Sequence, residues 1–234
     1  MASITWVGLL WCSLPVFIIA VIYFYWQGKP TEVLVASARM ALQLLGVGYL
    51  LVLLFEQQSI GWALVVLTVM ISAAAWIAIR PVSHHPGLFG PVFCALACAV
   101  GFHLYLSLYW VLDVPVWYEP RVLIPLAGMY FANGMNAISL AAERYYAELD
   151  RQYVEPQARI AAFRAAMIPQ INGLLAVGIV ALPGMMTGQI LSGVSPLVAV
   201  RYQIMIMTMV LGTAGMGAAM MLWLLSRRTE KSGS

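Results

Sequence analysis

Seven apolar runs, each long enough to cross a lipid bilayer, constrain this sequence more than any other feature. A spanning helix needs about 20 mostly apolar residues, and this chain of 234 residues is 63% apolar and only 9% charged. Because the edge of an open sheet would leave backbone groups unpaired in lipid, the spans are expected to be helices. The predicted spans are 6–26, 35–55, 61–79, 89–112, 122–142, 165–191 and 202–225. The sequence therefore predicts an all-α, polytopic membrane protein with a single transmembrane domain over residues 1–234.

The positive charges predict how the chain is oriented. Cytoplasmic loops of membrane proteins carry an excess of Lys and Arg. With the N-terminus outside and the C-terminus in the cytoplasm, ten of the twelve positive residues lie on the inner side, and only Arg121 and Arg201 lie outside. The first run has no preceding Lys or Arg and no small-residue cleavage site after it, so it is predicted to be a retained span and not a signal peptide.

Composition and missing motifs exclude several classes of function. The net charge of +3 is small and is not spread along a basic face, which argues against a nucleic-acid partner. The sequence has no phosphate-binding loop of the G-x-x-x-x-G-K-[ST] type and no recognisable catalytic set, so we expect no enzyme and no ATP hydrolysis in this chain. Every Asp and Glu falls in a loop or at a helix end, whereas ion-coupled carriers place an ionisable group at mid-membrane. Active transport would therefore take its energy from another polypeptide.

Two predicted spans contain proline followed by glycine and methionine. Proline removes a backbone donor, and broken helices at membrane depth are tolerated where they line a cavity or are buried in protein. Candidate hinges are Pro125, Gly128, Pro183 and Gly184. A candidate neutral ion path consists of Met129, Asn133, Asn136, Met185, Met186 and Gln189. The alternative is that these segments are packing kinks in which methionine fills gaps.

A metal site inside the chain remains unassigned by the sequence. Cys94 and Cys98 lie one helical turn apart with His103 further along, and soft ligands at such a spacing hold metals in some proteins. The alternative is that they are ordinary packing residues of an apolar helix.

The segment 143–164 is the only substantial polar stretch, and it is predicted to be cytoplasmic. We expect a helix extending from the fifth span, a turn near 154–156, and a short helix with Pro156 in its first turn. The stretch is either a solvated connection or a docking surface for a cytoplasmic partner. Candidate docking residues are Glu148, Leu149, Asp150 and Arg151, together with Arg39 and Gln43, which lie one helical turn apart at the inner start of the second span.

Three stretches of sequence point to a known family. They are Arg39-x-x-x-Gln43-Leu44-x-x-x-Gly48-Tyr49-x-Leu51, then Ile124-Pro125-Leu126-Ala127-Gly128-Met129 followed by Asn133-Gly134-Met135, and Leu182-Pro183-Gly184-Met185-Met186-Thr187-Gly188 with Gly193, Pro196, Ala199 and Arg201-Tyr202-Gln203-Ile204-Met205. In order and placement the chain after Thr31 resembles the permease subunits of bacterial iron-export ABC transporters, relatives of the plant aluminium-tolerance ABC permeases. The third and fourth spans match in hydropathy only.

The resemblance implies a homodimer of permeases in the bacterial inner membrane, exporting a metal ion such as iron. It also implies a separate ATP-binding subunit that holds ATP and Mg, with no cofactor in this chain. One departure stands out: the family has a longer inner segment with a Glu-x-x-Leu-x-Leu-Gly-Ala-like coupling element, whereas residues 143–164 are shorter and retain only Ala147-Glu148-Leu149-Asp150. The alternative function is therefore a motor-free channel, scaffold or regulator derived from that family. The ion, the direction of transport and the oligomeric state remain open from the residues alone.

Overall fold

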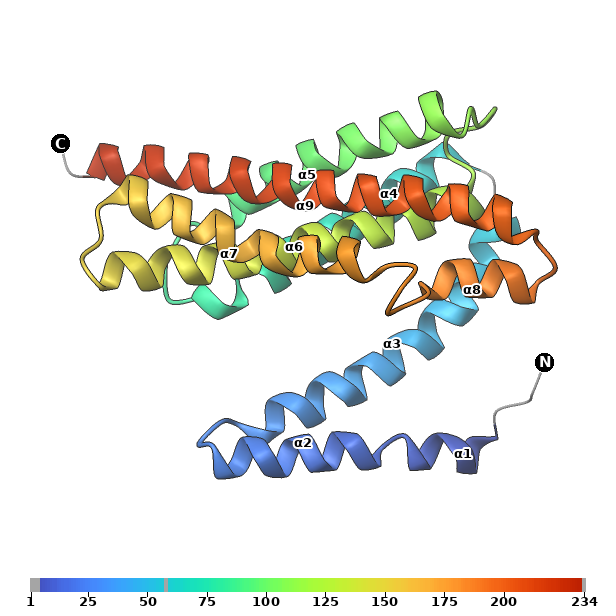
Figure 1. The fold of residues 1–234 in the computed structure, drawn as a ribbon, viewed down its shortest axis with the longest axis horizontal. Coiled ribbons are helices and arrows are strands. Elements are labelled where there is room, and N and C mark those ends of the chain that lie inside the picture. Colours follow the sequence, from blue (N-terminus) through green and yellow to red (C-terminus); the bar gives the residue numbers. More distant parts are fainter. Residues whose placement is uncertain (1–4, 57–58, 233–234) are drawn as a thin grey trace. The chain divides into compact units, whose positions relative to one another are not determined.

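The computed structural model describes residues 5–56 and 59–232, which form two units (Figure 1). The first unit contains α1 (Trp6–Trp11), α2 (Leu14–Tyr25) and α3 (Pro30–Glu56), with α2 packed on α3. The second contains α4 (Ile60–Ala78), the 3₁₀ turn η1 (Arg80–Val82), α5 (Phe89–Tyr105), the π-helix η2 (Leu106–Val111), α6 (Pro120–Asp150), α7 (Glu155–Ala176), α8 (Gly184–Leu191) and α9 (Pro196–Ser232). The prediction of an all-α membrane protein is confirmed.

The first predicted span is divided into two helices. Pro15 lies in the first turn of α2 and has no backbone N–H, so the carbonyl of Trp11 loses its helical donor and α1 ends there. The hydroxyl of Ser13 donates to the carbonyl of Leu10 at 2.6 Å. After α2 ends at Tyr25, Gln27 adopts a left-handed conformation with φ of 58°. The N–H groups of Gln27 and Gly28 donate to carbonyls in the last turn of the helix.

Helices α6 and α9 form the centre of the second unit. Each packs against α5 and α7, and α6 also packs against α4. The contact surfaces consist largely of small residues: Ala99, Ala127, Ala141, Ala162 and Ala214 are all completely buried. Small side chains let helix backbones approach closely, which drives helix association in lipid.

Five segments of the described chain are long and apolar enough to cross a membrane. They are Val7–Tyr25, Pro30–Val52, Ile60–Ala78, Phe89–Val111 and Pro196–Arg227. The other two predicted spans fall on α6 and on α7 with α8, where the amides of Asn133, Asn136, Gln170 and Asn172 lower the hydropathy. The exact number of spans and the orientation of the termini therefore remain predictions.

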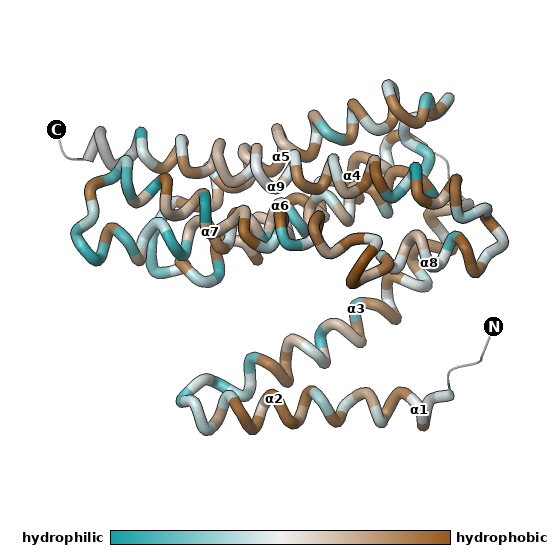
Figure 2. Tube along the Cα trace, viewed as in Figure 1, coloured by the Kyte–Doolittle hydropathy of each residue, from teal (hydrophilic) through white to brown (hydrophobic). Residues whose placement is uncertain are grey.

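Polar segments of the second unit gather at one end of its bundle. The ring of His85, in the α4–α5 loop, stacks on Tyr146 of α6 with centroids 3.7 Å apart. Arg159 of α7 donates to the hydroxyl of Ser226 near the end of α9, at 3.4 Å. Hydrophilic residues also collect at the α6–α7 turn (Figure 2). These segments are the ones that the charge pattern assigns to one side of the membrane.

The α6–α7 connection lies a few residues earlier than predicted. Helix α6 continues to Asp150, and two residues later Gln152 adopts a left-handed conformation with φ of 64°. The N–H of Tyr153 bonds to the carbonyl of Glu148 at 3.2 Å and that of Gln152 to Leu149 at 2.9 Å, the pattern of a Schellman motif. The turn thus covers residues 151–154, and Pro156 lies in the first turn of α7, as predicted.

The predicted span 165–191 consists of two helices, with the break beside the candidate hinges Pro183 and Gly184. Helix α7 ends at Ala176 and α8 starts at Gly184. Between them Gly178 adopts φ of 82°, and Pro183 is the extended N-cap of α8. By contrast, α6 runs without interruption through Pro125 and Gly128.

Candidate functional site: an uncharged cavity beside a broken helix

A cavity of about 450 Å³ lies within the second unit, bounded by α6, α7, the start of α8 and α9. Most of its wall is apolar, and four amide side chains enter it from three helices: Asn133, Asn136, Gln170 and Gln203. Three methionines, Met129, Met185 and Met207, add thioether sulfurs. None of the residues that line the cavity is ionisable.

The backbone near the cavity is irregular on two sides. Pro169 lies inside α7 and lines the cavity, and because it has no N–H the carbonyl of Ala165 lacks its helical donor. The loop 177–183 follows, where the N–H groups of Val180 and Ala181 both bond to the carbonyl of Ala176, at 2.8 and 3.2 Å. Irregular backbone beside a cavity supplies carbonyl groups that in a regular helix would accept the helix's own hydrogen bonds.

Asn133 is the best-anchored of the four amides. Its Nδ2 donates to the carbonyl of Met129, one turn earlier in α6, at 2.8 Å. This bond fixes the side chain along the helix and leaves the Oδ1 atom as an acceptor.

Gln203 carries the most unusual group of the site. Its side chain is only 6% exposed, and within the described part of the chain its Oε1 atom is buried and accepts no hydrogen bond. An unsatisfied buried acceptor costs about 1–3 kcal/mol. Gln203 also lines a neighbouring cavity of about 250 Å³ beside the loop 177–183. A bound solute that donates to this oxygen would remove that cost.

The structure gathers part of the predicted path and separates the rest. Met129, Asn133, Asn136 and Met185 line the one cavity, together with the candidate hinges Pro183 and Gly184. Met186 lines the neighbouring cavity. Gln189 lies on α8 outside both linings, with a buried Oε1 that has no partner within the described residues.

The other two candidate hinges lie elsewhere. Pro125 and Gly128 belong to the continuous part of α6. A Cβ atom on Gly128 would lie 3.6 Å from the end of Met70 in α4, so this glycine faces α4 and not the cavity.

Sequence reasoning missed Pro169, Gln170, Gln203 and Met207 as cavity residues. Pro169 and Gln170 do carry a sequence signal, because a proline with an amide beside it lies inside the predicted span 165–191. Gln203 lies within a motif that carries the family resemblance, but a lone Gln in a span gives no indication of which helix it will face.

The candidate metal ligands of α5 do not come together. Cys94 and Cys98 are exposed, whereas His103 is buried and its Nδ1 lies 2.7 Å from the carbonyl of Ala99. Nine residues separate Cys94 from His103, which places them on opposite faces of a helix with 3.6 residues per turn. Across the described residues, no group of three or more His, Cys, Asp or Glu side chains could hold a metal ion.

The candidate docking residues divide into internal and exposed ones. Glu148 is buried and its Oε1 pairs with Arg144 and, at 3.8 Å, with Arg151. Leu149 packs against the core. The exposed members are Asp150 and Arg151 at the α6–α7 turn, and Arg39 and Gln43 on α3 of the first unit.

An all-helical chain with long apolar helices is a polytopic membrane protein, and its cavity is uncharged and mostly apolar. The chain belongs to the family described as "Uncharacterised protein family (UPF0014)", which matches residues 6–161 and 154–229. The UPF0014 membrane protein slr1647 of Synechocystis is 35% identical, with 83% of this chain and 82% of the relative aligned. Protein ALUMINUM SENSITIVE 3 of Arabidopsis thaliana is 30% identical over 86% of this chain and 79% of its own.

A third relative carries a functional name. The probable iron export permease protein FetB of Escherichia coli is 29% identical, over 86% of this chain and 82% of its own. No solved structure matches the chain. The family that the sequence motifs indicate is thereby confirmed.

Proposed function

We propose that this chain is the transmembrane permease subunit of an ABC-type exporter, with a metal ion such as iron as its substrate and a separate ATPase subunit as its motor. The observation that carries the proposal is the uncharged cavity beside the broken helix. The name of the FetB relative supports metal export. The location that goes with this function is the bacterial inner membrane, with the N-terminus outside and two copies of the chain in the complex.

The chemistry of the cavity supports transport driven from outside this chain. Amide oxygens, thioether sulfurs and freed carbonyls are neutral ligands, so they bind a passing ion without the strong hold of a carboxylate. Carriers that use an ion gradient need a group that titrates or binds the driving ion, and the cavity wall contains no ionisable side chain. ATP and Mg would be bound by the partner subunit.

The α6–α7 hairpin is the element best suited to receive the partner's motion. The Schellman turn and the Arg144–Glu148 ion pair hold the end of α6 together. Asp150 and Arg151 are exposed at the tip, as are Tyr153 and Val154, which are 52% and 60% exposed. A docked partner subunit would cover these two side chains. A push on this tip would travel along α7 to the loop 177–183, with Pro183 and Gly184 as hinges.

The experiment is metal transport by the chain reconstituted in liposomes with its ATPase. We expect ATP-dependent movement of Fe²⁺, reduced at least tenfold by the double variant Pro183→Ala with Gly184→Ala while membrane insertion is kept. Gly188→Ala is the matched control, because a Cβ there meets no atom within 4 Å. ATP-independent movement, or full activity of the double variant, would contradict the proposal.

A motor-free channel, scaffold or regulator is the second candidate. It is favoured by the short turn over residues 151–154. The family match also divides there, into residues 6–161 and 154–229, which overlap at 154–161. Expression of the chain in cells without any partner ATPase separates the two functions: an unchanged metal phenotype would favour the second candidate, and loss of the phenotype the first.

A further inference from the structure

A groove of about 440 Å³ lies between α7 and α9, at the end of the bundle where the polar segments gather, and it is distinct from the amide-lined cavity. Its wall combines an apolar floor with two positive charges. The lining residues are Arg159, Ile160, Phe163, Arg164, Ala219, Leu222 and Trp223. We propose that this groove binds an anionic phospholipid, with the phosphate at the arginines and an acyl chain along the floor.

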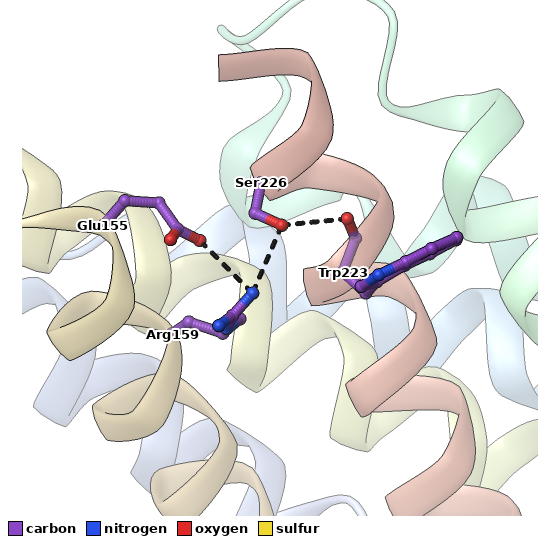
Figure 3. A network of polar contacts seen from close by, with 4 residues as sticks. All are labelled: Glu155, Arg159, Trp223 and Ser226. Atoms are coloured by element: carbon purple, nitrogen blue, oxygen red, sulfur yellow. Dashed lines mark hydrogen bonds and ion pairs between the residues drawn. The ribbon is translucent and has the colours of Figure 1, made fainter. Parts of the chain in front are cut away.

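The two arginines are held differently. Arg159 is pre-positioned by two contacts: its Nη1 lies 3.9 Å from Glu155 Oε1 and 3.4 Å from the hydroxyl of Ser226, which itself donates to the carbonyl of Trp223 at 3.0 Å (Figure 3). The Glu155 contact exceeds hydrogen-bond length, so the guanidinium keeps donors for a phosphate. Arg164 is exposed and forms no ion pair within the described part of the chain.

Trp223 and Arg227 place this groove at the level of lipid headgroups. The guanidinium carbon of Arg227 lies 3.9 Å from the centre of the Trp223 ring, so a third positive charge borders the groove. Tryptophan concentrates at membrane interfaces. Arg227 also ends the apolar part of α9.

The floor fits a hydrocarbon chain. Ile160 is 52% exposed on α7, and the small Ala219 on α9 leaves room between the helices. Basic pockets between helices on the cytoplasmic side bind anionic lipid headgroups, and each Lys or Arg near the surface strengthens the attraction. Among the described side chains at the groove, three arginines face the one carboxylate of Glu155, so the local charge favours an anion.

The test is native mass spectrometry of the whole chain in detergent with phosphatidylglycerol, phosphatidylcholine and glycerol 3-phosphate as probes. We expect phosphatidylglycerol to bind more tightly than phosphatidylcholine. Arg159→Gln and Arg164→Gln should each weaken that binding about fivefold. Arg151→Gln is the matched control, since it removes a positive charge at the same end of the bundle but outside the groove.

A second variant separates a lipid from a soluble phosphate. Ala219→Phe fills the floor and keeps all charges, so it should weaken phosphatidylglycerol binding without changing that of glycerol 3-phosphate. Equal binding of the two lipids, or binding unaffected by loss of both arginines, would overturn the proposal. Complete competition by glycerol 3-phosphate would instead assign the groove to a soluble anion. Loss of a co-purifying ATPase from the double arginine variant, with lipid binding unchanged, would assign it to protein docking.

Discussion

Both units, α1–α3 and α4–α9, contain long apolar helices, but the two units are built from different residues. In the span Pro30–Val52 no residue is buried, whereas ten of the 23 residues of Phe89–Val111 are. Ala20 is the buried residue of α2, and its other positions carry larger side chains such as Phe17, Ile18 and Phe24, all exposed. The second unit places alanine and glycine where its helices meet. Since lipid is as apolar as leucine, small size and close fit decide which faces of a helix pack.

The largest expected effect is at the crossing of α5 and α9. A Cβ atom on Gly212 would lie 2.2 Å from Nε2 of His103, whose ring is held by the carbonyl of Ala99. Gly212→Ala should therefore destabilise the protein by about 2 kcal/mol through overpacking. Thermal unfolding in detergent measures this loss.

The double variant Gly212→Ala with His103→Ala tests the cause. If the clash with the ring is the reason, the double variant should be more stable than the sum of the single changes predicts. Strict additivity would contradict this explanation.

A smaller loss of stability is expected on removing the buried hydrogen bond between Ser107 and Tyr130. Their hydroxyl oxygens are 2.7 Å apart, and the bond ties the π-helix η2 to α6. Tyr130→Phe should lower the free energy of unfolding by about 1 kcal/mol. Tyr49→Phe, on the exposed surface of α3, is the matched control and should change it little.

A glycine of the first unit should respond in the opposite direction. A Cβ on Gly48, in the middle of α3, would meet no atom within 4 Å. Gly48→Ala should therefore leave stability unchanged or raise it by about 0.5 kcal/mol, because alanine favours the helix. A loss as large as that at Gly212 would show that α3 packs as closely as α9 and would remove the contrast between the units.

The smallest expected effect is a dependence on pH that arises in the second unit, which contains all three histidines. Burial lowers the pKa of His85, its neighbour His84 lowers that pKa further, and Asp150 opposes both. The folded state then binds fewer protons than the unfolded state below about pH 6.5, so stability should fall as the solution is acidified from there.

His85→Phe keeps the stack on Tyr146 and removes the titration. The melting temperature of this variant should change less between pH 7.5 and pH 5 than that of the unchanged protein. An identical pH response in both would rule out His85 as its source.

Apolar run length, charge positions and prolines were sufficient to predict most of the helices, the polar end of the bundle and the break near Pro183. These features are local: a run of apolar residues needs a helix in lipid, and proline removes a donor wherever it falls. Four residues of the predicted path meet in one cavity, and the sequence displays them as amides and thioethers within apolar spans.

Which side of each helix packs against another helix, and which side faces lipid, was decided only by the tertiary structure. Apolar residues surround most of these helices, so hydropathy does not distinguish a lipid-facing side from a packed one. For that reason the sequence did not indicate that Gln170 and Gln203 join Asn133 at one cavity, that Cys94 and Cys98 are exposed while His103 is buried, or that Glu148 is buried against Arg144. Those outcomes depend on where small residues from distant parts of the chain allow helix backbones to meet.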